Sequence, residues 1–425
     1  MGVNCISAIV PRQEGEAQVI RWHRNPQGTR SGLRWRRLFR CCLCQALPVF
    51  CLVITGISCP AAAVPAGDPP LEETGKTQAK ETPSGLFLVK VTTARVGLYT
   101  PADPDGPKRI GRLRFVGGLQ VHGHDERFGG FSGLVVAPDR SALLAVSDHG
   151  FWMRADIVGD AAGRPADLVN VAMAPIRDWR GDPVEPVGED AEAIARSEGR
   201  LGPRLLVSFE HWHRVWSYPL IAGGSAPFLG AMLAPATPLR LPRKTLRHPA
   251  NGGIEAMVEL TDGRLLLFSE KDRLVDSRLT AWLVDPAGGR ASPLSLVPIA
   301  DGFAPSDAAR LPNGDLLLLE RRYRALEGPS AAIVRIARDD IRAGAVLHGE
   351  ELARLVPPVT LDNYEALDVA IGPDGRTWLY LMSDDNYRRT QRTLLMVFSL
   401  EEGAGAAPAG EKESARSGAG RSSEP

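Results

Sequence analysis

The sequence predicts an all-β protein with the β-propeller fold, and three observations predict it. A polar residue, a turn and an apolar run follow one another in the same order five times along the chain. Dipeptides typical of tight hairpins lie between apolar runs, and no long stretch has the spacing of an amphipathic helix. The 44 glycines and 34 prolines among 425 residues also agree with a fold rich in turns.

The repeated unit has the length of a propeller blade. Its five copies are Phe131–Gly150, Asp190–Trp212, Gly253–Asp272, Pro305–Tyr323 and Asn363–Tyr387. Aligned on their leading polar residues, they stand 60, 63, 52 and 58 residues apart; these residues are Ser132, Glu192, Glu255, Asp307 and Glu365. A unit of this length accommodates roughly four short strands with their turns.

Hairpins and chain ends complete the predicted ring. Asp262-Gly263, Asn313-Gly314 and Asp374-Gly375 are typical of tight turns between two strands. The strand-like segments 86–91, 110–115 and 393–400 are expected to form one more blade. Joining strands from both ends of the chain removes the free sheet edges. We therefore predict six blades, with five and seven as alternatives.

The N-terminal segment has the order of a secretory signal peptide. A basic cluster, Arg34 to Arg40, precedes an apolar run from Cys41 to Ile57 and then small residues up to Ala63. The run is short and interrupted for a membrane span, so we expect cleavage near Ala63 and no transmembrane segment in the mature chain. The expected location is the periplasm or the medium; lipid attachment at Cys59 is the alternative.

This pattern divides the chain into four parts: an N-terminal extension with the signal peptide (1–63), a linker (64–83), the propeller (84–401) and a disordered tail (402–425). All six cysteines precede residue 60, so a mature chain would have no disulfide and no thiolate nucleophile. Residues 1–40 carry +6, which leaves a mildly acidic body. Nucleic acid is therefore not expected as a partner.

Two sets of residues, almost uniformly acidic, are expected to gather at the propeller axis, because equivalent positions of each blade lie at equivalent places around it. One set is the leading residues of the repeats. The other stands at strand ends and comprises Asp148, Glu210, Glu270, Glu320 and Asp384. Calcium suits such oxygen-rich clusters, and the predicted metal ligands are Glu192, Glu255, Asp307 and Glu365. A purely structural role as turn acceptors is the alternative.

Basic residues follow the second set and could bind an anionic ligand. The predicted substrate-binding residues are Arg154, Arg273, Arg322 and Arg388. His149 and His211 are the candidates for general acid–base chemistry, because histidine titrates near neutral pH. Asp148 and Glu255 complete the predicted catalytic set.

Several of these segments resemble the phytase-like family, also described as having esterase-like activity of phytase. The resemblance rests on Phe131-Ser132-Gly133-Leu134, Ile254-Glu255-Ala256-Met257 and Ser383-Asp384-Asp385-Asn386, and extends over roughly 117–400. It implies an exported bacterial propeller that hydrolyses an ester or a phosphoester. Propeller phytases use calcium held by carboxylates around the central channel, but no calcium-site motif matches residue by residue.

The sequence leaves three functions open. The first is an exported hydrolase of a small anionic or ester substrate, assisted by calcium. The second is a non-enzymatic propeller that binds a ligand or a protein in the cell envelope. The third is a structural envelope protein held by a lipid on Cys59.

Overall fold

The computed structural model describes residues 78–100, 108–185, 188–199, 201–220 and 228–401, with the backbone of two short N-terminal strands. The chain divides into two compact units, Met1–Pro65 and Ala66–Pro425. In the first unit, β1 (Ser7–Val10) pairs antiparallel with β2 (Gln18–Arg21). The predicted signal-peptide run, Cys59, the cleavage site and the tail lie outside the described residues.

The second unit contains five sheets, antiparallel except for one added strand, and these sheets are the blades. Blade 1 consists of β7 (Phe131–Val136), β8 (Ala142–Ser147), β9 (Phe151–Gly159), β10 (Pro165–Pro175) and β3 (Phe87–Leu88). Blade 2 consists of β11 (Ala191–Ser197), β12 (Arg204–Phe209), β13 (Arg214–Pro219) and β14 (Thr237–Pro238). Blade 3 consists of β15 (Ile254–Glu259), β16 (Leu265–Arg273), β17 (Leu279–Asp285) and β18 (Arg290–Val297), with β22 (Val346–His348) added in parallel.

The last two blades follow the same plan. Blade 4 consists of β19 (Ala304–Arg310), β20 (Leu316–Arg324), β21 (Gly328–Ile336) and β23 (Glu350–Leu355). Blade 5 consists of β24 (Asn363–Ile371), β25 (Thr377–Asp384), β26 (Thr393–Leu400), β6 (Leu113–Gly123) and β4 (Val91–Val96), and β5 (Arg109–Ile110) pairs with β6. Among the described residues, the helices are short: α1 (Leu229–Leu233), η2 (Arg243–Leu246) and η3 (Arg338–Asp340).

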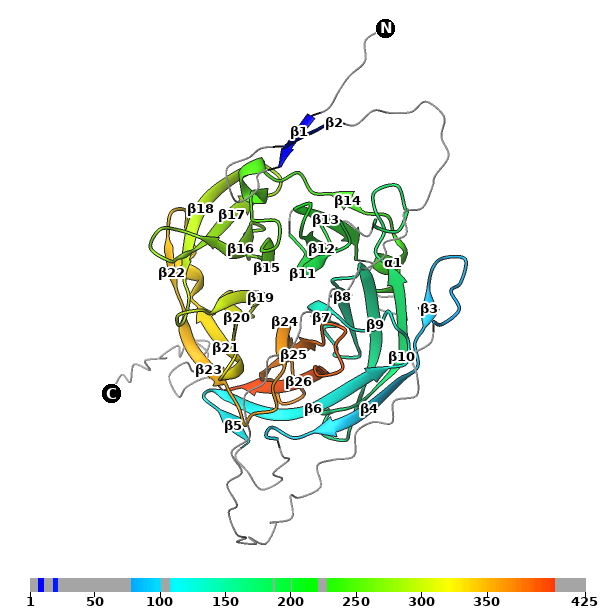
Figure 1. The fold of residues 1–425 in the computed structure, drawn as a ribbon. Helices are drawn as coiled ribbons and strands as arrows, with labels where there is room; N and C mark the ends of the chain where they lie inside the picture. The colour runs from blue at the N-terminus through cyan, green and yellow to red at the C-terminus, as the bar shows by residue number, and fades with distance from the viewer. Residues whose placement is uncertain are drawn as a thin grey trace, which may run out of the picture. The chain divides into compact units, whose positions relative to one another are not determined.

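The first strand of each blade lies at the centre of the unit (Figure 1). Contacts join β7 to β11, β11 to β15, β15 to β19, β19 to β24 and β24 to β7, so these five strands close a ring. The all-β propeller predicted from the sequence is confirmed. Among the described residues, no helix is long and apolar enough to cross a membrane.

The predicted count of six blades is wrong. The repeat of blade 5 supplies only three strands, and the terminal segments complete that blade instead of forming another. β26 pairs with β6 from Leu400 opposite Leu113 to Thr393 opposite Val121, so strands from both ends of the propeller do close the ring. β3, the earliest strand of the unit, extends blade 1.

The apolar core is divided into five clusters, one between each pair of neighbouring blades. Blades 1 and 5, for example, bury Phe131, Met153, Trp378 and Leu395 against one another. Each blade packs against two neighbours, and both of its faces are apolar, because successive side chains of a strand point to opposite faces. Polar side chains of the inner strands therefore lie toward the axis or at the strand ends.

Candidate functional site

Each inner strand has a β-bulge near its first residues. In β7, Phe131 lies opposite Ser147 and Gly133 opposite Val146, so Ser132 is the extra residue. The same shift leaves Glu255 extra in β15 and Glu365 extra in β24, and in β11 it includes Glu192. A bulge bends the strand and redirects a side chain. The leading residues of these four repeats thus occupy one structural position.

Blade 4 departs from the predicted register by one residue. Pro305 lies opposite Glu320 and Asp307 opposite Leu319, so the extra residue of β19 is Ser306, not Asp307. The strand-end position of blade 4 is shifted in the same way. In blades 1 and 2, the backbone N–H of the strand-end acid, Asp148 or Glu210, donates to the residue two positions before the bulged residue. In blade 4 that residue is Ala304, and it lies opposite Arg321. A serine and an arginine therefore stand where the predicted sets placed Asp307 and Glu320.

Asp307 and Glu320 point elsewhere. Asp307 is fully buried, and its Oδ2 accepts the backbone N–H of Leu367 in blade 5 at 2.7 Å. Glu320 is also fully buried and accepts the N–H of Ile299 at 2.9 Å. Burial raises the pKa of both side chains, that of Glu320 to about 7. The strand register thus corrects the placement of both residues at the axis.

The other four blades contribute eight carboxylates that lie close together. We call them the axial cluster: Asp148, Asp190, Glu192, Glu210, Glu255, Glu270, Glu365 and Asp384. Glu192 of blade 2 interacts electrostatically with Glu255 of blade 3 and with Glu365 of blade 5. Because blades 2 and 5 are not neighbours in the ring, the cluster extends across the axis.

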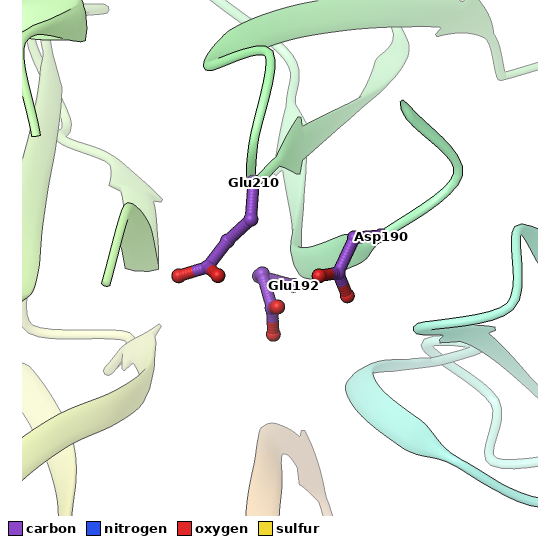
Figure 2. A group of neighbouring side chains, drawn as sticks. All are labelled: Asp190, Glu192 and Glu210. Atoms are coloured by element: carbon purple, nitrogen blue, oxygen red, sulfur yellow. The ribbon is translucent and has the colours of Figure 1, made fainter. Parts of the chain in front are cut away.

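Three of these residues, all from blade 2, are near enough to share an ion. Ligand oxygens of Asp190, Glu192 and Glu210 lie within 4.8 Å of one another, and Figure 2 shows the carboxyl groups turned toward a common space. One oxygen of Glu210 accepts the backbone N–H groups of Gly252 and Gly253, the latter at 2.6 Å. This leaves the second oxygen of Glu210 for the cluster.

The crowding of acids raises their pKa values. Burial raises the pKa of Asp148 to about 7, and Asp190 and Glu365 add to the effect. Burial likewise raises the pKa of Asp384 to about 8, with a contribution from Glu365. For Glu192 and Glu255, burial and neighbouring carboxylates raise the pKa well above the ordinary value. Removing water from a carboxylate and placing like charges beside it both disfavour ionisation.

Asp148 is held in place by close packing. Its Oδ1 is buried and has no hydrogen-bond partner among the described residues. Gly130 has a φ of +64°, and a Cβ there would overlap with this oxygen and with the Tyr387 ring. Glycine at position 130 therefore provides both the left-handed backbone and the space that Asp148 occupies.

The two predicted histidines lie beside the cluster. His211 Nε2 is 3.3 Å from Asp190 Oδ2, and its side chain is 47% exposed. The His149 ring stacks on Tyr387 with centroids 4.0 Å apart. Burial lowers the pKa of His149, which keeps its ring neutral near pH 7. Both imidazoles are thus within the electrostatic range of Asp190.

The predicted substrate-binding arginines do not come together. Arg154 is buried in the third strand of blade 1, where it pairs with Asp156. Arg322 pairs with Glu327 at 2.7 Å, and Arg273 donates to the Ser277 carbonyl at 3.2 Å. Arg388 is exposed in the turn after β25. The arginine that does reach the cluster is Arg321.

Arg321 contacts carboxylates of two other blades. Its Nη2 is 2.8 Å from Glu365 and 3.5 Å from Glu270, and its Nη1 donates to Asn363 at 3.2 Å. Burial opposes the charge on Arg321, but Glu365, Glu270 and Glu255 together raise its pKa. The sequence prediction missed it because Arg321 and Arg322 are adjacent and point to opposite faces of the strand. Asp190, the first residue of its repeat, was missed because the equivalent positions of the other repeats have no acid.

Comparisons with known proteins identify the family and find only distant structural likenesses. Among solved structures, the chain is similar to a protein of unknown function from Bacteroides caccae at 14% identity and a TM-score of 0.27, covering 57% of this chain and 65% of that chain. The present chain thus spans less than two thirds of that protein. It is also similar to the β-propeller domain of Cps50 (Swd1) from Myceliophteria thermophila at 12% identity and a TM-score of 0.33, covering 73% and 99%.

A structure described as glucose dehydrogenase shows the same level of similarity, with 12% identity, a TM-score of 0.33, and 67% and 98% coverage. These likenesses are too distant to bear on activity. No curated protein matches the chain significantly. The model of the family described as "Phytase-like: Esterase-like activity of phytase" matches residues 126–387. The chain therefore belongs to the phytase-like family.

Proposed function

We propose that this protein is an exported hydrolase that cleaves a small ester or phosphoester at the axial cluster, with calcium as its cofactor. The observation that carries the proposal is the meeting of eight carboxylates from four blades, with Arg321 of blade 4 in contact with two of them. So many like charges stay ionised together only with a cation nearby.

The chemistry of the donor set fits calcium. The three closest residues, Asp190, Glu192 and Glu210, offer only oxygen ligands, and the buried Oδ1 of Asp148 has no donor among the described residues. Calcium takes six to eight oxygens in flexible geometry, which suits carboxylates and water. We propose Asp190, Glu192 and Glu210 as the residues that would hold it. When bound, calcium would polarise the scissile ester and lower the pKa of a water molecule.

The protein's own side chains would then handle the proton. His149 is neutral near pH 7 because burial lowers its pKa, so it can accept a proton from the attacking water. The stacked Tyr387 ring fixes its orientation. His211, exposed beside Asp190, is placed to donate a proton to the leaving group. Asp190 would stabilise the protonated imidazole, as carboxylates paired with histidine do.

Hydrolysis of p-nitrophenyl phosphate and p-nitrophenyl acetate by the mature protein tests this proposal. We expect activity on at least one substrate, its loss with a calcium chelator, and its return with added calcium. Glu192→Gln should abolish it, and the matched control Glu320→Gln, a buried acid outside the cluster, should retain it. Calcium binding without turnover of any ester would favour the alternative, a non-enzymatic binding propeller of the cell envelope.

A further inference from the structure

Blade 4 is the exception among the five blades at the axis. At the bulge it has Ser306 where three blades have glutamate, and at the strand end it has Arg321 where four have an acid. This is a reversal of charge at one repeated position. It adds a cation to the cluster and at the same time removes one carboxylate.

The guanidinium of Arg321 reaches the acids of the blades on either side. It contacts Glu270 of blade 3 and Glu365 of blade 5, and Glu255 and Glu192 lie within its electrostatic range without a contact. Lys271 Nζ adds a contact to the other oxygen of Glu270 at 2.8 Å. Glu270 and Glu365, the two glutamates in contact with Arg321, therefore have their compensating charge within the protein.

The remaining acids differ. Asp190 pairs with His211. The structure gives no ion pair, among the residues that it describes, for the other five acids of this group: Asp148, Glu192, Glu210, Glu255 and Asp384. The buried Asp148 Oδ1 has no donor among those residues either. The cluster thus has two parts: Glu270 and Glu365, which are ion-paired to Arg321, and the other acids, on blades 1, 2, 3 and 5, which are not.

We infer that Arg321 is a built-in counter-ion that takes the place of one divalent cation, and that its removal opens a cation site at Glu270 and Glu365. Together with the proposed function, on which this step rests, the functional calcium is confined to the blade 2 side. There it lies beside His149 and His211, so the reaction centre is off the propeller axis. Arg321 is a positioning residue in this scheme.

The number of calcium ions bound per molecule, measured by native mass spectrometry on the mature protein, tests this role. Arg321→Gln should bind one calcium more than the wild type. Arg321→Lys, which keeps the charge, and Arg322→Gln, which removes the adjacent arginine on the other face, should bind the same number as the wild type. An unchanged number in Arg321→Gln overturns the inference.

Comparing Arg321→Gln with the wild type separates the role of Arg321 from the proposed function. The variant is expected to bind one calcium more than the wild type, whatever number the wild type binds. A wild type without calcium contradicts the proposed function alone. If Arg321→Gln does not fold, the double variant Arg321→Gln/Glu365→Gln restores the balance of charge and should fold. Failure of both variants would mean that the arginine acts through packing, and would also overturn the inference.

Discussion

Carboxylates on the inner strands form two groups with the same chemistry and different surroundings. Glu259, Asp307 and Asp368 each accept a backbone N–H from the neighbouring blade; we call them latch acids. Glu192, Glu255 and Glu365 face other carboxylates across the axis. The difference shows that the role of a buried acid depends on its partner. A latch acid joins two blades through a hydrogen bond, whereas an axial acid is repelled by the neighbouring carboxylates until a cation is bound.

The latch acids are the better satisfied group. Glu259 accepts from Ser197 Oγ at 2.7 Å and from the N–H groups of Glu198 and Gly199 at 2.7 and 2.9 Å. Asp368 accepts from the N–H of Val136 at 2.7 Å. Buried backbone donors need a partner, and deleting it leaves the cost of burying an unpaired group. We therefore expect the latch acids to contribute to the free energy of unfolding and the axial acids to contribute to calcium binding.

The largest expected effect comes from breaking a latch. Asp307→Ala removes the acceptor of two backbone N–H groups, those of Leu367 and Ala308, in a fully buried place. We expect a loss of about 3 kcal/mol in the free energy of unfolding, measured by urea titration. The axial variant Glu255→Gln is the control and should not be destabilised. Equal losses in both would erase the distinction between the groups.

The opposite change is expected at the axis. In calcium-free protein, Glu192→Gln removes a buried acid whose ionisation its neighbours oppose, and should stabilise the fold by about 1 kcal/mol. The melting temperature should then rise by about 3 °C. Glu259→Gln, a matched change in a latch, should lower it. A lower melting temperature for Glu192→Gln would show that this glutamate is a structural acceptor.

The pH dependence of stability should have an unusual sign. Burial raises the pKa of Asp148 to about 7 and of Asp384 to about 8, from an ordinary value of 3.8. The folded state therefore binds more protons than the unfolded state in this window, and stability falls as pH rises. We expect the melting temperature of calcium-free protein to drop by about 5 °C from pH 5 to pH 8.5.

Two additions check this explanation of the pH profile. Calcium favours the ionised carboxylates and should flatten the profile. The double variant Asp148→Asn/Asp384→Asn should reduce the slope, and the part that remains belongs to acids such as Glu320, whose pKa burial also raises. A melting temperature that increases toward pH 8.5 without calcium would contradict the assigned pKa shifts.

Much of the site could be predicted from the repeats, because Glu192, Glu255 and Glu365 share one equivalent position and Asp148, Glu210, Glu270 and Asp384 share another. Blade 4 could not. Ser306-Asp307 and Glu320-Arg321 each offer two polar residues in a row, and only the bulge decides which of them faces the axis. A shift of one residue reverses the two faces of a strand, so an acidic position was predicted where Arg321 lies.

The blade count shows a different limit. Strand segments at both ends of the propeller were recognised as strands, but their partners are far away in the sequence. β6 and β26 pair across more than half of the chain, and nothing local in either indicates that pairing. Hairpins within each repeat, by contrast, have their turn residues between the two strands, and these were predicted correctly for Asp262-Gly263 and Asn313-Gly314.

The most direct test of the central claim, that axial acids bind a cation and latch acids do not, is isothermal titration of calcium into the chelator-treated protein. The wild type should bind calcium, Glu192→Gln should bind it at least about tenfold more weakly, and Glu259→Gln should bind it like the wild type. Absence of binding to the wild type, or equal weakening in both variants, would contradict the account.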